Sequence, residues 1–478
     1  RVMGKTELWQ WDAVDLAKAI RLRKISSREA TEACLKRLDA VNPRLNAITF
    51  QIAEHALRDA DAADAAVKAG EVLGPLHGVP VSTKENIDQK DLPTPNGVVA
   101  YKDVIAPADS PVVANCRKAG AVFIGRTNCP AYSLRWDTDN ALRGRTYNPW
   151  AKGRTPGGSS GGAGAALAAG IGPISHGNDY GGSIRYPAYC CGVAGIRPTM
   201  GRVPAFNPSA QGERPPTIAL FAVQGPLARH VKDVRLGLHA MSGRDARDPW
   251  WVPAHHHGRG AQRPIKVGLI AGAPGLYTHP AVAEAVRKAG AALSNAGYAV
   301  EEVTPPSIEA ARELWVKLVA ADIREMLWET IEANADPLGI KAVKLWRDAL
   351  PPISMADYIK GFSQVTRHRR EWSLFLEQYP LLVGSNCGDL PFEIGFDTTD
   401  MERTRHVLAS QALMVTVNLL GFPAAAVPVG TTAVDGAPNG LPLGVQIIAA
   451  RYREDLALDA AEVVEAQHGL ETPIDPVW

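Results

Sequence analysis

The chain has 478 residues, of which 46% are hydrophobic and 21% are charged, and its formal net charge is +1. A chain of this length and composition can bury a large globular core without support from disulfides or metal ions. Because the net charge is close to zero, the sequence predicts no long-range attraction to nucleic acid or to an anionic membrane.

Six cysteines are present, and no two of them have the Cys-x-x-Cys spacing of a zinc knuckle or a thioredoxin-like site. We therefore expect free thiols in a cytoplasmic protein that uses no metal and no cofactor. The first residues lack a charged start followed by an apolar segment, so the sequence predicts no secretory signal.

The N-terminal part of the chain predicts helices that lead into a short strand. A capping box favours a helix over 26–41, which Asn42 and Pro43 are expected to end. An alanine-rich helix is expected near 52–69. The segment 78–84 then indicates a turn and a short strand with a lysine at its end.

Two strand–helix–strand units follow along the chain. In the first, a helix starts at Ser110-Pro111 and ends at Gly120, and a buried strand over 121–124 is expected to stop at Gly125. The second has a strand at 265–270, a helix at 280–296 and a strand at 298–303. This alternation predicts an α/β fold class with a mixed, largely parallel sheet.

The C-terminal half changes in character. Residues 305–378 are amphipathic and rich in tryptophan, which is more typical of a packed helical layer than of a substrate box. The apolar stretch 412–429 contains Asn, Gly and Pro, so it predicts a buried helix end, a turn and a core strand, and no membrane helix. A strand at 444–448 and a helix at 455–465 follow. The histidine-rich stretch 248–263 is expected to be an exposed loop.

The most unusual segment is the glycine-rich run 155–164, with the sequence Thr-Pro-Gly-Gly-Ser-Ser-Gly-Gly-Ala-Gly. Glycine at this density costs conformational entropy. It indicates backbone with unusual dihedral angles or a close approach to a ligand, and a small-residue helix is expected directly after it.

A second glycine pair precedes a serine in the run 179–183, with the sequence Asp-Tyr-Gly-Gly-Ser. Consecutive N–H groups around such a turn can form an anion-binding nest, and the serine oxygen would lie beside it, as acyl transfer requires. A serine nucleophile needs a base. Lys84 is favoured over His176, because burial among apolar neighbours disfavours the ammonium and a neutral amine can accept a proton.

Taken together, these motifs resemble the amidase-signature family. The resemblance rests on Gly-Val-Pro at 78–80 with Lys84, on Gly-Gly-Ser-Ser-Gly-Gly at 157–162 and on the run 179–183. Further blocks in the family's order lie at 120–128, 148–150, 192–199 and 441–446. The resemblance covers roughly residues 8–470, and His176 to Asp179 is similar to the branch of 6-aminohexanoate cyclic dimer hydrolases.

The resemblance implies one amidase-signature domain over 1–478, with a helical insert or lid at 305–380 and helices on both faces of a twisted sheet. It also implies a Ser–cis-Ser–Lys triad in which Ser183 is the nucleophile, Ser159 relays the proton and Lys84 is the base, with an acyl-enzyme intermediate. The remaining implied roles are the oxyanion hole, from the N–H groups of Tyr180, Gly181 and Gly182, and substrate binding by Ser160 and Asp179. Members of the family often form homodimers, so the resemblance also implies a homodimer.

Three positions depart from the family pattern. Tyr180 stands where a small or β-branched residue is usual, Arg126 where lysine is common, and Ala131 where glutamate is common. Because an oxyanion hole needs only the backbone of Tyr180, we expect its ring to shape the site. The other two are expected to affect packing or specificity.

Parts of the sequence also match two functions other than that of a free-standing amidase. The segment 157–161 matches the Gly-x-Ser-x-Gly nucleophile elbow, but 151–156 is poor strand material, and the elbow requires a strand there. A glutaminase subunit of a tRNA-dependent amidotransferase has a similar N-terminal half, although no partner-docking feature is recognised here. The sequence therefore favours an amidase acting on a small apolar or aromatic amide, with anilides, esters and carbamates (a urethanase activity) left open.

Overall fold

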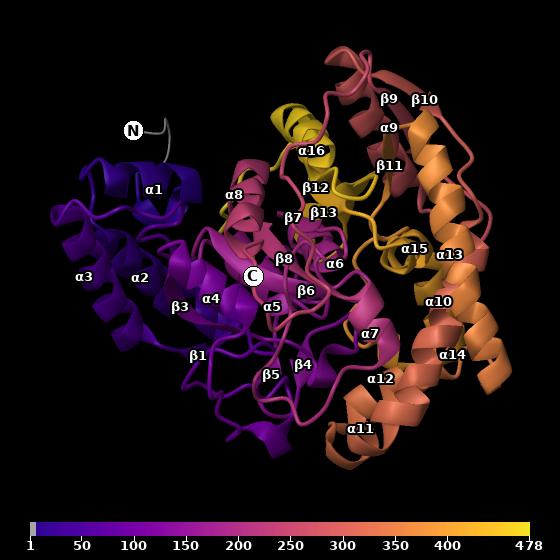
Figure 1. Ribbon diagram of the computed structural model, residues 1–478, viewed down its shortest axis with the longest axis horizontal. Helices are drawn as coiled ribbons and strands as arrows, with labels where there is room; N and C mark the ends of the chain where they lie inside the picture. The colour runs from indigo at the N-terminus through magenta and orange to yellow at the C-terminus, as the bar shows by residue number, and fades with distance from the viewer. Residues whose placement is uncertain (1–5) are drawn as a thin grey trace.

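The computed structural model describes residues 6–478. Figure 1 shows a central sheet with the N-terminal helices at one end of the molecule and the helices of the Trp-rich region at the other. The strands are β1 (Ile48–Gln51), β2 (Pro80–Lys84), β3 (Val122–Thr127), β4 (Asp139–Asn140), β5 (Gly144–Arg145), β6 (Ile174–Asp179), β7 (Ala194–Arg197), β8 (Val223–Ala228), β9 (Lys266–Ile270), β10 (Ala299–Glu302), β11 (Leu381–Ser385), β12 (Ala424–Val434) and β13 (Ala437–Ala449).

The large sheet has the strand order β1-β3-β2-β6-β8-β7-β12-β13-β11-β9-β10, and β4 and β5 form a separate pair. Parallel pairing occurs in two blocks, β3-β2-β6 and β11-β9-β10, and every pairing between β6 and β11 is antiparallel. The predicted α/β class with a mixed sheet is confirmed. The parallel blocks contain the two predicted strand–helix–strand units, because parallel neighbours need a crossover helix.

Helices cover both faces of the sheet. They are α1 (Ala13–Arg21), α2 (Ser27–Leu45), α3 (Ala53–Lys68), α4 (Pro111–Lys118), α5 (Gly161–Ala168), α6 (Arg185–Cys191), α7 (Pro216–Phe221), α8 (Val231–Met241), α9 (Pro280–Asn295), α10 (Ile308–Asp322), α11 (Trp328–Asn334), α12 (Pro337–Arg347), α13 (Met355–Gln378), α14 (Met401–Ser410), α15 (Ala412–Leu420) and α16 (Glu454–His468). In β3, Phe123 packs in the cluster that contains α4, α8, α9 and α16, whereas Val122 and Ile124 pack in the cluster that contains α2, α5 and α6. Because side chains alternate along a strand, these clusters lie on opposite faces.

The predicted elements agree with the structure except at several of their ends. The helix α2 has the predicted capping box at Ser26 but continues through Pro43 to Leu45, so the predicted end at Asn42-Pro43 is wrong. Proline removes a single N–H in the last turn, and the buried Asn42 side chain accepts the N–H groups of Ala47 and Ile48 as the chain leaves the helix.

The predicted stop of β3 at Gly125 is also wrong, since the strand runs to Thr127. A Cβ atom at position 125 would lie 2.5 Å from the Cγ2 atom of Ile48, on the neighbouring strand β1. This glycine therefore marks a close approach between strands and not a strand end.

The C-terminal elements are of the predicted type, but the predicted strand bounds are wrong: β12 continues past 429 to Val434, and β13 begins at Ala437 and not at 444, because the two strands pair as a long hairpin. Residues 412–429 form α15, a left-handed turn at Gly421 and the start of β12. The stretch 248–263 contains no helix or strand and is mostly exposed, as predicted. The helices α10 to α13 occupy 308–378, with a π-helical turn at Ile323–Leu327. Within residues 6–478, no helix is both long and apolar enough to cross a membrane.

The glycine-rich run lets α5 lie directly against neighbouring backbone. A Cβ atom at Gly162 would lie 2.3 Å from the backbone nitrogen of Asn128 and 2.8 Å from the carbonyl oxygen of Ala47. We expect Gly162→Ala to lower the free energy of unfolding by about 3 kcal/mol, because backbone cannot yield as a flexible side chain can. Gly272→Ala, where a Cβ meets nothing within 4 Å, is the control. Equal denaturation midpoints for the two variants would refute this explanation.

Candidate active site

Lys84 is the last residue of β2, a strand that is buried along its whole length. Its Nζ atom lies 2.5 Å from Ser159 Oγ, 3.0 Å from Ser160 Oγ and 2.7 Å from Asn178 Oδ1. Burial lowers the pKa of Lys84 to about 7. Near neutral pH a large fraction of this lysine is therefore uncharged and able to accept a proton.

Ser159 lies just before α5, and its peptide bond to Gly158 is cis. Gly157 has a φ of +84°, and a Cβ atom at Gly158 would lie 2.4 Å from the backbone nitrogen of Asp137. The dense glycines are thus needed for unusual dihedral angles and close backbone contacts, as the sequence indicated.

Ser183 follows Gly182, whose φ is +112°. The backbone N–H of Ser160 donates to the carbonyl oxygen of Ser183 at 3.3 Å, which ties the two serine-bearing segments together. Ser183 is buried to all but 6% and contributes to a cavity wall. Within the part of the chain described, its hydroxyl forms no hydrogen bond, so the structure joins Lys84 to Ser159 and leaves the Ser183 hydroxyl without a partner.

Asp179 holds the loop that leads to Ser183. It accepts the N–H of Gly182 at 2.9 Å and that of Ile184 at 3.2 Å, and the buried Arg185 guanidinium donates to both of its carboxylate oxygens. Burial alone would raise the pKa of Asp179, but Arg185 outweighs burial and the pKa lies well below its usual range. The loop is therefore built on a permanent carboxylate.

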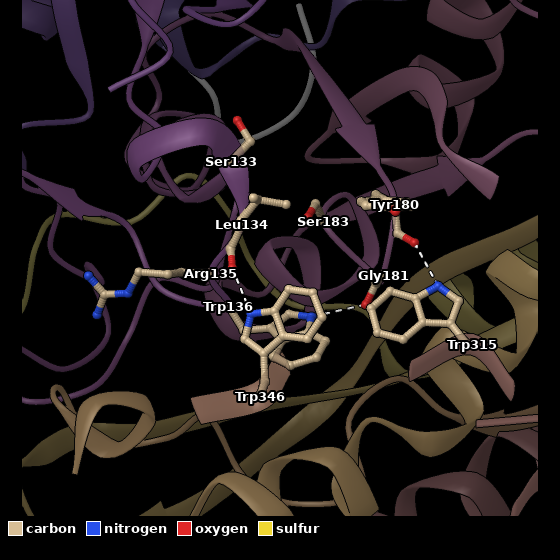
Figure 2. A pocket seen from close by; sticks show the side chains of 9 residues that line it. All are labelled: Ser133, Leu134, Arg135, Trp136, Tyr180, Gly181, Ser183, Trp315 and Trp346. Carbon is tan, nitrogen blue, oxygen red and sulfur yellow. Dashed lines mark hydrogen bonds between the residues drawn. The ribbon is translucent and has the colours of Figure 1, made fainter. Parts of the chain in front are cut away.

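Two indoles hold the outer side of the same loop. Trp315 Nε1 donates to the carbonyl oxygen of Tyr180 at 3.3 Å, and Trp136 Nε1 donates to that of Gly181 at 2.9 Å (Figure 2). In a trans peptide the N–H points opposite to the C=O, so Trp315 fixes the direction of the Gly181 N–H. Across residues 6–478, the N–H groups of Tyr180 and Gly181 have no hydrogen-bond partner, whereas that of Gly182 donates to Asp179.

A cavity lies beside this loop and encloses about 330 Å³ of empty space, a volume that includes open solvent at its mouth. Its wall is strongly aromatic, because the ring of Trp315 lies 6.4 Å from that of Trp136 and 6.0 Å from that of Trp346, centroid to centroid (Figure 2). Arg135 lines one edge, but its guanidinium points away from the cavity and pairs with Asp397 at 2.8 Å. The lining residues are Ser133, Leu134, Arg135, Trp136, Tyr180, Gly181, Ser183, Trp315 and Trp346.

The tryptophans of the helical region are divided between core and cavity. Trp372 is fully buried in the core, as predicted, whereas Trp315 and Trp346 belong to the core and also form the cavity wall. Trp136 was not singled out from the sequence, because nothing in its neighbourhood shows that it meets a loop 45 residues away. The predicted substrate contacts Ser160 and Asp179 are both fully buried and are not among the residues that line the cavity.

Two titratable side chains, His176 and Arg126, form hydrogen bonds with the backbone of Lys84. Burial lowers the pKa of His176 to about 3, so this side chain is neutral; its Nε2 bonds to Gln224 Oε1 at 2.8 Å. Arg126 is buried and donates to the carbonyl oxygens of Ile87, Pro93 and Lys84, the last at 3.3 Å. Arginine at this family-divergent position thus braces the backbone that carries the lysine.

The fold and its relatives define an enzyme that hydrolyses amide bonds. The Amidase family model matches residues 29–458, and the chain belongs to this family, the amidase-signature enzymes.

Individual relatives cover nearly the whole chain. An indoleacetamide hydrolase from Bradyrhizobium diazoefficiens is 46% identical over 98% of this chain and 88% of its own length. An acylamidase from Rhodococcus erythropolis is 34% identical over 97% of each chain. The solved structure of 6-aminohexanoate cyclic dimer hydrolase with its substrate matches with a TM-score of 0.83 at 28% identity, over 99% of each chain.

Proposed function

We propose that this enzyme hydrolyses a small amide whose acyl group carries a flat aromatic ring, such as indoleacetamide. The observation that carries the proposal is the cavity that places Ser183 among Trp136, Trp315 and Trp346. The relative named indoleacetamide hydrolase supports the same substrate class.

Hydrolysis proceeds through an acyl-enzyme. Ser183 Oγ attacks the amide carbon while its proton passes to Ser159 Oγ, and the Ser159 proton passes to the neutral Lys84 Nζ. The C–N bond then breaks as the amine takes a proton back along the same path, and water cleaves the resulting ester by the same sequence of transfers. The Lys84–Ser159 distance of 2.5 Å and the lysine pKa of about 7 support this relay.

The oxyanion forms in the loop before Ser183. The N–H groups of Tyr180 and Gly181 are available to stabilise it, and the two indole hydrogen bonds keep the loop in place before substrate arrives. The Gly182 N–H, which completes the predicted set, donates to Asp179 in the free enzyme.

The helical insert at 305–380 acts as the wall and lid of the substrate site, since α10 and α12 contribute Trp315 and Trp346. This aromatic wall suits an aryl acyl group better than a glutamine side chain, which argues against the amidotransferase alternative. Esters and carbamates of similar shape would share the intermediate. A cytoplasmic location is supported by six buried free cysteines, and a homodimer stays a prediction.

The first test compares substrates. We expect kcat/KM for indole-3-acetamide to exceed that for acetamide by about 10²-fold, because burying roughly 120 Å² of ring at about 25 cal/mol per Å² contributes about 3 kcal/mol. The measurement is ammonia release from a panel of amides, with phenyl esters, anilides and carbamates alongside. Equal efficiency for both amides, or preferred hydrolysis of glutamine, would refute the aromatic assignment.

Tryptophan variants provide the matched comparison. Trp346→Ala should remove most of the preference for the aromatic amide while leaving acetamide hydrolysis within a few-fold of wild type. Trp328→Ala is the control, because Trp328 belongs to the same helical layer, stacks with Arg347 and does not line the cavity.

A further inference from the structure

Lys84 has three hydrogen-bond neighbours but only two N–H groups when neutral. Its Nζ atom lies within 3.0 Å of oxygen atoms on Ser159, Ser160 and Asn178. A neutral amine has two donors and one lone pair, so one neighbour must donate to it. Which neighbour donates decides whether the lysine can act as a base toward Ser159.

The orientation of the Asn178 amide can be traced to a backbone group. The backbone N–H of Lys84 donates to His176 Nδ1 at 3.3 Å, so the ring proton is on Nε2, which donates to Gln224 Oε1 at 2.8 Å. Gln224 Oε1 also accepts Asn178 Nδ2 at 3.3 Å, and Asn178 Nδ2 donates to Asn86 Oδ1 at 2.8 Å. The amide oxygen of Asn178 therefore faces Lys84.

An amide oxygen can only accept, so Asn178 Oδ1 takes one N–H of the lysine at 2.7 Å. Ser160 takes the other. Its hydroxyl has one acceptor within the described structure besides the lysine, the carbonyl oxygen of Asn178 at 3.5 Å. With its own proton turned there, Ser160 Oγ accepts from Lys84 at 3.0 Å.

We infer that Asn178 is a positioning residue: together with Ser160 it occupies both N–H groups of neutral Lys84 and so points the lysine lone pair at the Ser159 hydroxyl. This inference deepens the proposed function and rests on it. The neighbouring residues His176 and Gln224 hold the Asn178 amide in the required orientation.

The inference predicts a specific effect of charge at this position. Asp in place of Asn178 would still accept from Lys84, but a carboxylate at this distance favours the ammonium form. The charged and titratable groups around Lys84 are Asp179 at the end of β6, Cys129 after β3, His176 on β6 and Arg126 on β3. None of them contacts the Nζ atom directly, so a new carboxylate there should dominate.

The experiment measures the rate at which a fluorophosphonate labels Ser183, as a function of pH. The serine oxygen bonds to phosphorus, fluoride leaves, and the serine proton passes to Lys84, so the readout does not depend on which amide is the substrate. Wild type should show a rate that rises with pH around a midpoint near 7. In Asn178→Asp the midpoint should move up by at least one pH unit, with the rate recovering at high pH.

Two further variants keep the test decisive. Asn178→Leu should lower the labelling rate by about 10-fold or more at every pH with little change in KM for the amide, because one lysine N–H loses its acceptor. Gln224→Met should produce a smaller loss, since it frees the Asn178 amide to rotate. Asn295→Asp, on the exposed end of α9, is the charge-matched control and should match wild type.

The outcomes separate the two claims. Labelling of Asn178→Asp and Asn178→Leu with the wild-type midpoint and within twofold of the wild-type rate would overturn the inference alone. If the fluorophosphonate fails to label wild-type Ser183, the inference falls together with the proposed nucleophile. A loss in Asn178→Asp that is equal at all pH values would show a packing role and would also overturn it.

Discussion

Ser183→Ala is expected to lower kcat for amide hydrolysis by about 10⁴-fold or more, because no acyl-enzyme can form without the nucleophile. KM should change little, since the aromatic wall that we propose binds the acyl group is left intact. The variant should fold normally, because within the described residues the Ser183 hydroxyl forms no hydrogen bond that is lost. Single-turnover assays with indole-3-acetamide and mass spectrometry of a trapped acyl-enzyme provide the measurement.

Ser159→Ala distinguishes the triad from a nucleophile elbow. In the triad Ser159 relays protons, so its loss should slow acylation. A fluorophosphonate label should still appear on Ser183 of this variant. In an elbow enzyme Ser159 would itself carry the label and Ser183→Ala would keep most activity, and that result would refute our assignment. Ser294→Ala, on the exposed end of α9, controls for the loss of a hydroxyl.

The sequence predicted much of the framework because the relevant signals are local. The capping box at Ser26, the strand that ends on Lys84 and the glycine-rich run before α5 each depend on residues within a few positions of one another. Local signals failed at Pro43 and Gly125. There the outcome depended on the Asn42 side chain and on the approach of β1, which are contacts between elements.

The aromatic wall could not be predicted for the same reason. Trp136, Trp315 and Trp346 come from three distant segments, and a tryptophan that packs in a core has the same sequence pattern as one that also borders a cavity. The hydrogen bonds from Trp136 and Trp315 to the loop carbonyls leave no sequence signal, because a backbone acceptor is available at every position. Asn178 is a similar case, since its role is visible only through His176 and Gln224.

These contacts explain how a cavity lined by apolar side chains can border a polar reaction centre. The Asp179–Arg185 pair supports the loop from the buried side, and the two indoles support it from the cavity side. If the loop stabilises the substrate oxyanion as we propose, it would not need to reorganise when the charge develops, which is the condition for effective electrostatic stabilisation. In the proposed function the same indoles would provide the apolar surface for the acyl group, so substrate binding and loop geometry would be linked.

Lys84→Met is expected to lower kcat by about 10²–10⁴-fold, because Ser159 then has no base to receive its proton. The pKa of Lys84 also predicts the direction in which kcat/KM of the wild type changes with pH. Only the neutral amine accepts a proton, and burial lowers the pKa of Lys84 to about 7, so kcat/KM should be low in acid and rise with pH to a plateau above about pH 8. A lysine with the ordinary value of 10.5 would leave the rate still rising at pH 10.

Lys84→Arg separates the charge of the side chain from its ability to accept a proton. Arginine keeps the length and charge of the side chain but stays protonated at all accessible pH values, so it should be as inactive as methionine here. Lys288→Met, on the exposed surface of α9, should match wild type and shows that losing a lysine is harmless elsewhere. If Lys84→Arg retained substantial turnover, or if the wild-type rate did not change between pH 5 and pH 9, a neutral lysine could not be the base and the proton relay through Ser159 would have to be abandoned.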